Sequence, residues 1–233
     1  MKLHIFYRHL DTSKYFEISK ERPQWFNYEK CFVNLLYTIQ KHNVSLNVVY
    51  DGNDSDNFIF KYKDKFNLYR IEAGSDFGSF VETWKLVKES HISDDELIYF
   101  LENDYLHQKD WYEKVVDFFK KHDHLTYLSL YDHLDKYIFD DYINLQSQLM
   151  ITQNHHWRTT PSTCGSFIIT KKLFDLDYDI HTNIYTDHDK FLKLNQERGR
   201  KVVTPIPGLS THCSYDLLSP TIDWYKINEE THE

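Results

Sequence analysis

The feature that most constrains the fold is an alternation of strand-like and helix-like segments through the first half of the chain. Short runs of bulky apolar residues predict buried strands at 2–7, 45–50, 67–74 and 96–104. Apolar residues at helical spacing predict helices between them, at 24–43, 79–90 and 111–122. Strands that alternate with helices predict an α/β protein with a mostly parallel central sheet and right-handed crossovers.

The second half of the chain is less regular. Strands are predicted at 125–133, 165–170 and 201–206, and a helix at 186–200. Residues 132–161 are rich in Tyr, Asp, Asn, Gln and His without clean periodicity. A connection of this length predicts a functional, partly structured or mobile segment. Because no repeat or interdomain linker is evident, we predict a single domain over 1–233.

Composition excludes several classes of protein. A hydrophobic content of 41% and an aromatic content of 17% indicate a folded globular chain. The formal charge of −9 argues against a nucleic-acid partner. Cys31, Cys164 and Cys213 are widely spaced, which favours reduced thiols. No signal peptide or transmembrane segment is evident. We therefore expect a cytoplasmic protein, with peripheral attachment to a membrane left open.

An acidic triplet follows the apolar strand at 96–101. Glu102 and Asp104 flank Asn103, so in an extended chain their side chains point the same way. Carboxylate oxygens suit Mg²⁺ or Mn²⁺, which complete their shell with phosphates and water. Arg8, Asp51 and Glu72 follow the other strands. Ligands of open α/β sheets bind beyond such strand ends, so these side chains predict a site there. The alternative for the triplet is a solvated turn.

These features resemble the GT-A glycosyltransferases, particularly the family 2-like group. The group's Asp-x-Asp motif takes the form Glu102-Asn103-Asp104, with Asp104 as the more secure metal ligand because the first position is Glu. The segment 185–213 is similar to the group's Glu-Asp-x-Asp motif with the helix, Gly, strand and His that follow. Asp187 matches the catalytic aspartate and Asp189 the next acidic position. His212 matches a late histidine that completes the metal shell.

The resemblance implies a metal-dependent glycosyltransferase, with 1–105 binding the nucleotide and 106–233 the acceptor. A sugar would move from a nucleotide-diphospho-sugar, a UDP-sugar by default, to a hydroxyl of a saccharide or other acceptor. Mn²⁺ or Mg²⁺ would neutralise the leaving diphosphate, and Asp187 as base would give inversion. The donor contacts expected from the resemblance and the strand ends are Tyr7, Arg8, Asp51, Ser79 and Asn103. The acceptor-side residues are Thr163, Gly165, Ser166 and Asp189.

Other interpretations of these residues stay open. Arg8 could form a structural ion pair, Asp51 could only shape a turn, and Asp187 could only stabilise a helix N-terminus with Thr186 as N-cap. Thr186 also departs from the group's pattern, which has Glu there. The alternative functions are a retaining GT-A transferase, a nucleotidyltransferase and a sugar-binding module without turnover.

Overall fold

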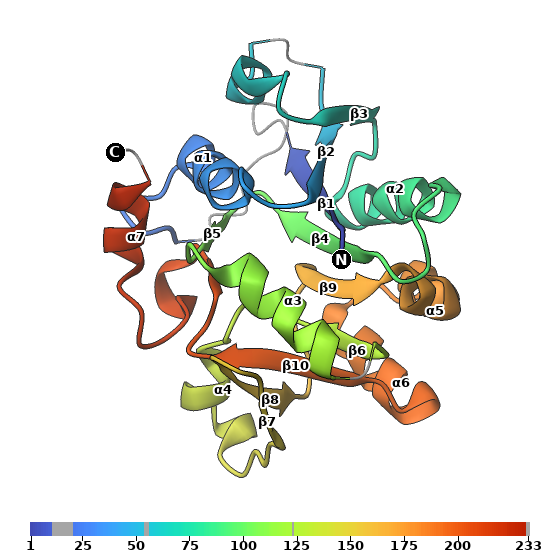
Figure 1. Ribbon diagram of the computed structural model, residues 1–233, viewed down its shortest axis with the longest axis vertical. Helices are drawn as coiled ribbons and strands as arrows, with labels where there is room; N and C mark the ends of the chain where they lie inside the picture. The colour runs from blue at the N-terminus through green and yellow to red at the C-terminus, as the bar shows by residue number, and fades with distance from the viewer. Residues whose placement is uncertain (11–20, 54–55, 123, 232–233) are drawn as a thin grey trace.

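The chain is organised around a mixed sheet of nine strands in the part of the protein that the structure describes (Figure 1). This computed structural model describes residues 1–10, 21–53, 56–122 and 124–231. The strand order is β3-β2-β1-β4-β9-β6-β10-β8-β7. The strands are β1 Leu3–Leu10, β2 Val44–Asp51, β3 Asn67–Ile71, β4 Leu97–Glu102, β6 Thr126–Leu128, β7 Leu149–Ile151, β8 His156–Thr160, β9 Phe167–Thr170 and β10 Lys201–Ile206.

The four strands of the first half are parallel, as the sequence predicts. β1 lies between β2 and β4, and the register pairs Arg8 with Glu102 and Leu10 with Asp51. The ends of these strands therefore meet at one edge. Beyond β4 the sheet is mixed, because β9 runs antiparallel to β4 and β8 runs antiparallel to β10. The predicted mixed α/β sheet is confirmed.

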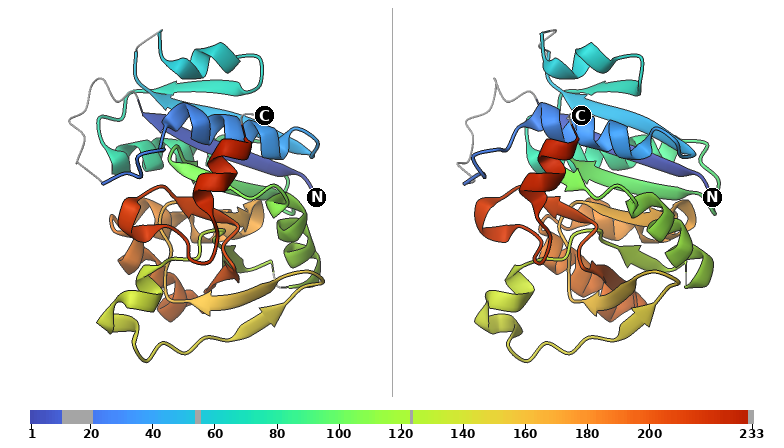
Figure 2. Two further views of the ribbon diagram at one scale, coloured as in Figure 1. Left: turned by 90° about the vertical axis from the view of Figure 1, so that its left-hand side faces the viewer. Right: turned by 60° about the vertical axis from the view of Figure 1, so that its left-hand side comes forward.

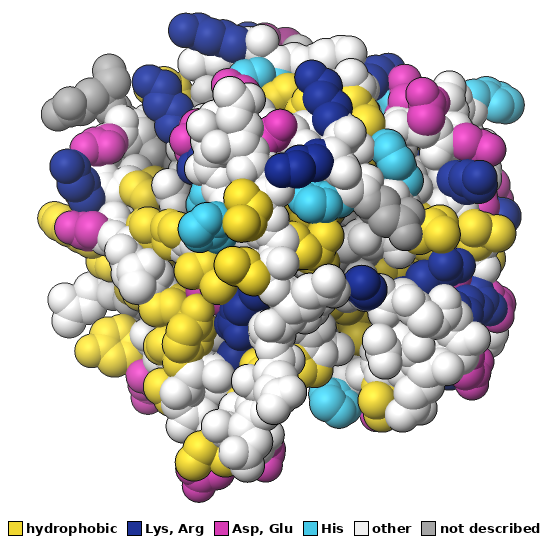
Figure 3. All heavy atoms as spheres, turned by 60° about the horizontal axis from the view of Figure 1, so that its bottom comes forward, with side chains coloured by type: hydrophobic (Ala, Val, Ile, Leu, Met, Phe, Trp, Pro, Cys, Tyr) yellow, Lys and Arg dark blue, Asp and Glu magenta, His cyan; other side chains and the backbone are white. Residues whose placement is uncertain are grey.

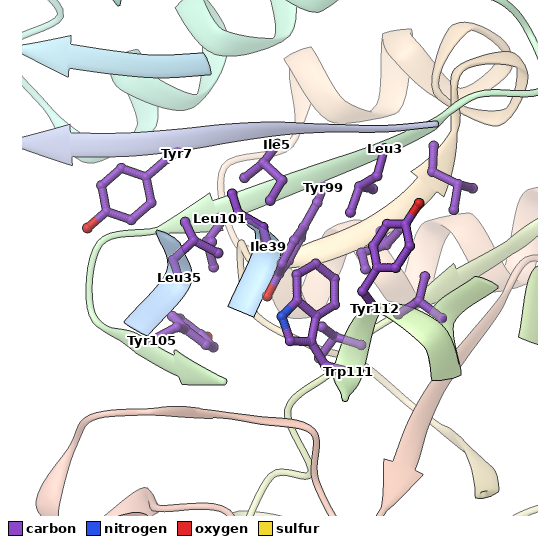
Figure 4. Close-up of a cluster of buried hydrophobic side chains, with 14 of the residues drawn as sticks. Leu3, Ile5, Tyr7, Leu35, Ile39, Tyr99, Leu101, Tyr105, Trp111 and Tyr112 are labelled. Atoms are coloured by element: carbon purple, nitrogen blue, oxygen red, sulfur yellow. The ribbon is translucent and has the colours of Figure 1, made fainter. Parts of the chain in front are cut away.

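Helices cover both faces of the sheet. Their bounds are α1 Tyr28–Ile39, α2 Asp76–Glu89, α3 Trp111–Lys121, α4 Asp135–Ile138, α5 Lys171–Asn183, α6 Asp187–Arg198 and α7 Trp224–Glu230. Side chains of α1 and α3 share one core cluster with Ile5 and Tyr7, the side of the sheet shown in Figure 4. Side chains of α2, α5 and α6 share the opposite cluster with Phe6. Successive residues of a buried strand face opposite sides, so β1 contributes to both clusters.

A small second sheet lies beside the carboxyl ends of the main strands. β5 (Tyr105–His107) follows the acidic triplet and pairs antiparallel with β11 (Ser210–His212). The register places Tyr105 opposite His212. Figure 2 shows this side of the molecule, with the C-terminal segment and α7 in red. This pairing brings the C-terminal segment to the sheet edge.

The irregular stretch at 132–161, predicted to be functional, partly structured or mobile, contains several short elements. Within 132–161 lie α4, a short 3₁₀ helix (Asp140–Tyr142), β7 and β8. Figure 3 turns the lower side of Figure 1, where these elements lie, toward the viewer, and hydrophobic side chains gather on that face. The exposed apolar side chains of this stretch are Tyr137, Ile138, Phe139, Ile143, Leu149 and Ile151.

Two further 3₁₀ helices, Phe58–Tyr62 and Tyr215–Leu217, connect other elements. Among the described residues, no helix is both long and apolar enough to cross a membrane.

Candidate active site at the strand ends

Asp104 and His212 meet at the junction of the two sheets. Asp104 precedes β5 and His212 ends β11, so the antiparallel pairing carries them together. His212 Nε2 donates to Asp104 Oδ2 at 2.9 Å. The backbone N–H of Cys213 donates to the Asp104 carbonyl oxygen at 2.8 Å and fixes the register. Two residues that lie far apart in the sequence therefore form one polar pair.

Arg22 joins this pair from another segment. Its Nη2 donates to Asp104 Oδ2 at 2.8 Å, and its Nη1 donates to the Cys213 carbonyl oxygen at 2.7 Å. The Asp104 side chain is 6% exposed and that of Arg22 is 20% exposed. Burial alone would lower the pKa of Arg22, but the Asp104 carboxylate raises it. Arg22 therefore supplies the positive charge that a buried carboxylate at a strand end requires.

Glu102 has a different set of partners from Asp104. Arg8 Nη2 donates to Glu102 Oε1 at 3.2 Å, and Ser166 Oγ donates to Oε2 at 3.2 Å. Burial raises the pKa of Glu102, although the nearby Arg8 opposes the rise. Arg8 also donates to the Ser79 hydroxyl at 3.4 Å.

Arg8 is itself held inside the protein. It donates to Asp76 Oδ1 at 3.0 Å, and its guanidinium lies 3.2 Å from the centroid of the Phe80 ring. Arg8 thus forms the structural ion pair that the sequence left as an alternative to a donor contact. Ser79, the other predicted donor contact on this side, faces Arg8.

Two of the residues predicted to contact the donor, Tyr7 and Asn103, lie close to His9. Tyr7 donates through its hydroxyl to the Asn103 carbonyl oxygen at 3.3 Å, and Asn103 Nδ2 donates to His9 Nδ1 at 3.1 Å. His9 Nε2 then donates to Asn57 Oδ1 at 2.9 Å. The ring of His9 lies against Tyr7 and Tyr50, with centroids 6.1 and 5.8 Å away.

Asp51 ends β2 beside this cluster. Its Oδ1 accepts from the backbone N–H of Ala73 at 3.2 Å, so it ties the end of β2 to the segment after β3. The carboxylate is buried rather than projecting as a simple surface turn would require. The structure therefore brings Tyr7, Asn103 and Asp51 to the same edge of the sheet.

Asp187 opens α6 on the other side of the strand ends. Lys190 Nζ donates to Asp187 Oδ1 at 3.1 Å, and the Asp187 side chain is 31% exposed. Lys190 is buried, 4.7 Å from the centroid of the Trp84 ring. Thr186 is the N-cap, because its hydroxyl accepts from the backbone N–H of Asp189 at 3.3 Å. Capping thus occupies Thr186 and Asp189 and leaves the Asp187 carboxylate to Lys190 and solvent.

The predicted acceptor-side residues Thr163, Gly165 and Ser166 are all held by contacts with neighbouring elements. Thr163 donates to Ser129 Oγ at 2.8 Å and accepts from His133 Nε2 at 3.0 Å. A Cβ at Gly165 would lie 2.0 Å from the Phe80 ring, so only glycine fits there. Burial raises the pKa of the Cys164 thiol, and the carboxylates of Glu102 and Asp187 raise it further. The Cys164 thiol is thus kept in its neutral form, and it lies against the Tyr105 hydroxyl at 2.6 Å.

Asp104 and His212 are the residues of this site that could hold a divalent cation. Asp104 offers a carboxylate, which suits Mn²⁺ or Mg²⁺, and His212 offers an imidazole, a softer ligand that favours Mn²⁺ over Mg²⁺. Glu102 is engaged by Arg8 and Ser166. Across the described ranges, no three His, Cys, Asp or Glu side chains gather around one point. Mg²⁺ commonly uses one or two protein ligands and completes its shell with phosphates and water. The residues fit a cation that arrives together with a diphosphate.

Comparison with known proteins identifies the fold. No protein-family model matches the chain, and no curated protein matches it. The inositol-1-phosphate CTP transferase from T. maritima has a TM-score of 0.51 at 12% identity, covering 99% of this chain and 96% of its own. The 4-diphosphocytidyl-2C-methyl-D-erythritolsynthase from Anaerococcus prevotii DSM 20548 has a TM-score of 0.50 at 12% identity, covering 100% and 96%.

S. aureus TarS 1-349 has a TM-score of 0.47 at 16% identity over 87% of this chain. The present chain spans 58% of the length of that structure. The likeness to the two transferases establishes the fold alone: this chain has the α/β fold on which they are built. The expected α/β fold with a mixed, mostly parallel central sheet is confirmed.

Three residues of the site were not predicted from the sequence: Arg22, His9 and Lys190. Lys190 follows Asp187 by three positions on a helix, so the i,i+3 spacing was a usable signal. His9 directly follows Arg8 in the first strand, and no motif marks it. Arg22 is separated from Asp104 by 82 positions and carries no motif of its own.

Proposed function

We propose that this protein is a metal-dependent glycosyltransferase that moves a sugar from a nucleotide-diphospho-sugar to an acceptor hydroxyl. The observation that carries the proposal is the meeting of Asp104 and His212 at 2.9 Å beyond the end of β4. A second carboxylate, Asp187, is partly exposed at the start of α6. The two carboxylates match the two charge changes of sugar transfer, one at the leaving diphosphate and one at the attacking hydroxyl.

On the leaving side, Asp104 and His212 would hold Mn²⁺ or Mg²⁺. Held by these two residues, such a cation would supply positive charge against the charge that develops on the departing diphosphate. Tyr7, Asn103 and Asp51 would orient the nucleoside at the adjoining strand ends. UDP is the default nucleotide in this proposal.

On the attacking side, Asp187 would act as the general base. The acceptor oxygen forms a bond to the anomeric carbon while the bond from that carbon to the diphosphate oxygen breaks. The hydroxyl proton passes to Asp187, and the nucleoside diphosphate leaves with the bonding electron pair. Lys190 orients the Asp187 carboxylate at 3.1 Å. Direct displacement of this kind inverts the anomeric configuration, whereas a retaining transferase would not need this base.

A nucleotidyltransferase is the second candidate, because the two matching structures with TM-scores of at least 0.5 named above are CTP-linked enzymes on this fold. Reaction products separate the candidates. Incubation of the protein with a UDP-sugar and Mn²⁺ is expected to release UDP slowly, by transfer to water. A nucleotidyltransferase instead releases pyrophosphate when given a nucleoside triphosphate and a sugar phosphate.

A protein that releases neither product with any of the common nucleotides, with or without Mn²⁺, would be a sugar-binding module and would refute the proposal. A second experiment tests the ligand role of Asp104 directly. The variant Asp104→Asn should lose Mn²⁺-dependent UDP binding, measured by calorimetry. Unchanged UDP affinity in that variant, with and without Mn²⁺, would exclude the proposed ligand role of Asp104.

A further inference from the structure

Arg22 occupies the side of Asp104 to which the proposed cation would bind. One oxygen, Asp104 Oδ2, accepts from both Arg22 at 2.8 Å and His212 at 2.9 Å. Arg22 and His212, the second proposed metal ligand, therefore share one oxygen of Asp104, the first proposed metal ligand. A cation that uses Oδ2 cannot share it with a guanidinium hydrogen bond along the same direction.

Arg22 is held in place by its surroundings. The backbone carbonyl of Glu21 accepts from the backbone N–H of Tyr215 at 2.9 Å, which ties this segment to the C-terminal region. The guanidinium also lies 4.6 Å from the centroid of the Phe26 ring. These contacts keep an arginine beside the carboxylate whether or not the two remain paired.

We infer that Arg22 competes with the divalent cation for Asp104 and, once displaced, turns to the diphosphate of the donor. The inference rests on the proposed function, because it takes the cation site at Asp104 and His212 as given. It adds a residue that no motif predicts and assigns it a role in ordering the binding of cation and nucleotide.

The chemistry of arginine supports both halves of the inference. In the cation-free protein, the guanidinium neutralises a carboxylate whose side chain is 6% exposed. When the carboxylate turns to a cation, the mostly buried guanidinium needs another anion. A diphosphate presents oxygens in the geometry that a guanidinium binds through two parallel hydrogen bonds. The hydrogen bond from Arg22 Nη1 to the Cys213 carbonyl oxygen, at 2.7 Å, does not involve Asp104 and can persist while Nη2 changes its partner.

The competition for Asp104 and the later binding of Arg22 to the diphosphate predict opposite effects of one substitution on the affinities for Mn²⁺ and UDP. Arg22→Gln should tighten binding of Mn²⁺ alone by about tenfold, because the wild-type carboxylate is available only in the fraction of molecules in which Arg22 is displaced. The same variant should weaken UDP binding at saturating Mn²⁺ by about tenfold, the loss of a charged hydrogen-bond donor. Mn²⁺ binding is measured by electron paramagnetic resonance of free Mn²⁺, and UDP binding by calorimetry.

Two further variants serve as controls. Lys61→Gln makes the same change in net charge at a surface ion pair with Glu29 and should leave both affinities unchanged. Arg22→Lys keeps the charge, but one ammonium cannot reproduce the two-point bridge from Asp104 to the Cys213 carbonyl. Its Mn²⁺ affinity should fall between those of the wild type and Arg22→Gln, and it replaces Arg22→Gln if that variant does not fold.

The outcomes separate the inference from the proposed function. Wild-type protein that binds Mn²⁺ while Arg22→Gln binds it no better would overturn the competition and leave the cation site standing. Tighter Mn²⁺ binding without weaker UDP binding would overturn the transfer of Arg22 to the diphosphate. If neither protein binds Mn²⁺, with or without UDP, both the inference and the metal dependence of the proposed function fail.

Discussion

The two carboxylates of the candidate site are built in opposite ways. Asp104 is buried at the junction of two sheets, and its partners Arg22 and His212 are separated from it by 82 and 108 positions. Asp187 is partly exposed at a helix start, and its partner Lys190 lies three positions away. The first carboxylate is held by tertiary structure and the second by a single turn of helix.

The difference in burial between Asp104 and Asp187 matches the role proposed for each carboxylate. A group that holds a cation and a diphosphate benefits from a rigid, mostly dry environment in which charge interactions are strong. A base that takes a proton from an arriving acceptor needs to be reached from solvent. The buried carboxylate should therefore respond to changes in distant segments, and the exposed one only to changes in its own helix.

The largest effect is expected from removing the base. Asp187→Asn should lower turnover by about 10²–10⁴-fold, since the amide cannot accept the acceptor's proton. UDP binding in the presence of Mn²⁺ should stay at the wild-type value. Steady-state transfer rates together with calorimetry measure both.

The matched control for this prediction is Glu197→Gln, an exposed acidic residue on the same helix that pairs with Lys193. It should transfer sugar at the wild-type rate. Near-normal transfer by Asp187→Asn would show that the base lies elsewhere or that the enzyme retains configuration.

A third carboxylate sharpens the contrast between held and exposed acids. Asp177 on α5 is fully buried and accepts from Arg198, Arg200 and Tyr127 at 2.9 to 3.0 Å. Asp177→Ala would remove the carboxylate that pairs with Arg200 and would leave Arg198 with the Asp179 carboxylate alone. We expect a loss of about 3–5 kcal/mol in the free energy of unfolding, measured by urea denaturation.

Asp179→Asn is the control for Asp177, because Asp179 pairs with the same Arg198 at the surface, with its side chain 62% exposed. Its cost should be about 0–1 kcal/mol. Equal costs for the two variants would contradict the contrast between buried and exposed acids.

A smaller effect is expected at Gly165, which packs against the Phe80 ring. Gly165→Ala would place a Cβ 2.0 Å from the Phe80 ring, against which Arg8 lies. Overpacking of this kind costs about 1–3 kcal/mol, and thermal unfolding would detect it. Adding Phe80→Leu should recover part of the loss; a double variant no more stable than Gly165→Ala would show that the ring is not the obstacle.

The strand that follows Asp104 gives the smallest test, a dependence of stability on pH. Burial lowers the pKa of His107 from 6.5 to about 3. Between these values the unfolded chain binds more protons than the folded one, so stability falls as pH falls through this window. His107 contributes a slope of up to about 1.4 kcal/mol per pH unit.

Urea denaturation at several pH values between 7 and 5 measures this slope. His107→Gln should make it shallower, whereas His91→Gln, a change at an exposed position, should not alter it. An unchanged slope in His107→Gln would mean that His107 is protonated in the folded protein.

The sequence predicted the parallel half of the fold well because its signals are local. The apolar runs that became β1, β2 and β4 are buried on both faces, and such runs read as strands without knowledge of their neighbours. The approach of Asp104 to His212 was expected only through the resemblance to a known motif. Their proposed roles, like that of Asp187, remain predictions.

The parts of the fold and of the site that were not predicted depend on contacts between segments that are distant in the sequence. β7 is apolar but only three residues long and mostly exposed, and β8 is composed largely of polar residues, so neither presents the long buried apolar run that marks β4. Helix α5 was not predicted, since Asp residues interrupt its apolar stripe. Arg22 could not be connected to Asp104 because only the folded chain places the two side chains together.

The pairing of β5 with β11 also determines when the site comes into existence. Its strands are separated by about a hundred positions, and contacts of such long range form late because the intervening chain must first be ordered. During synthesis, the sheet around β1, β2 and β4 can assemble while His212 is still inside the ribosome. The candidate site is therefore incomplete in a nascent chain until His212 has emerged and β11 has paired with β5.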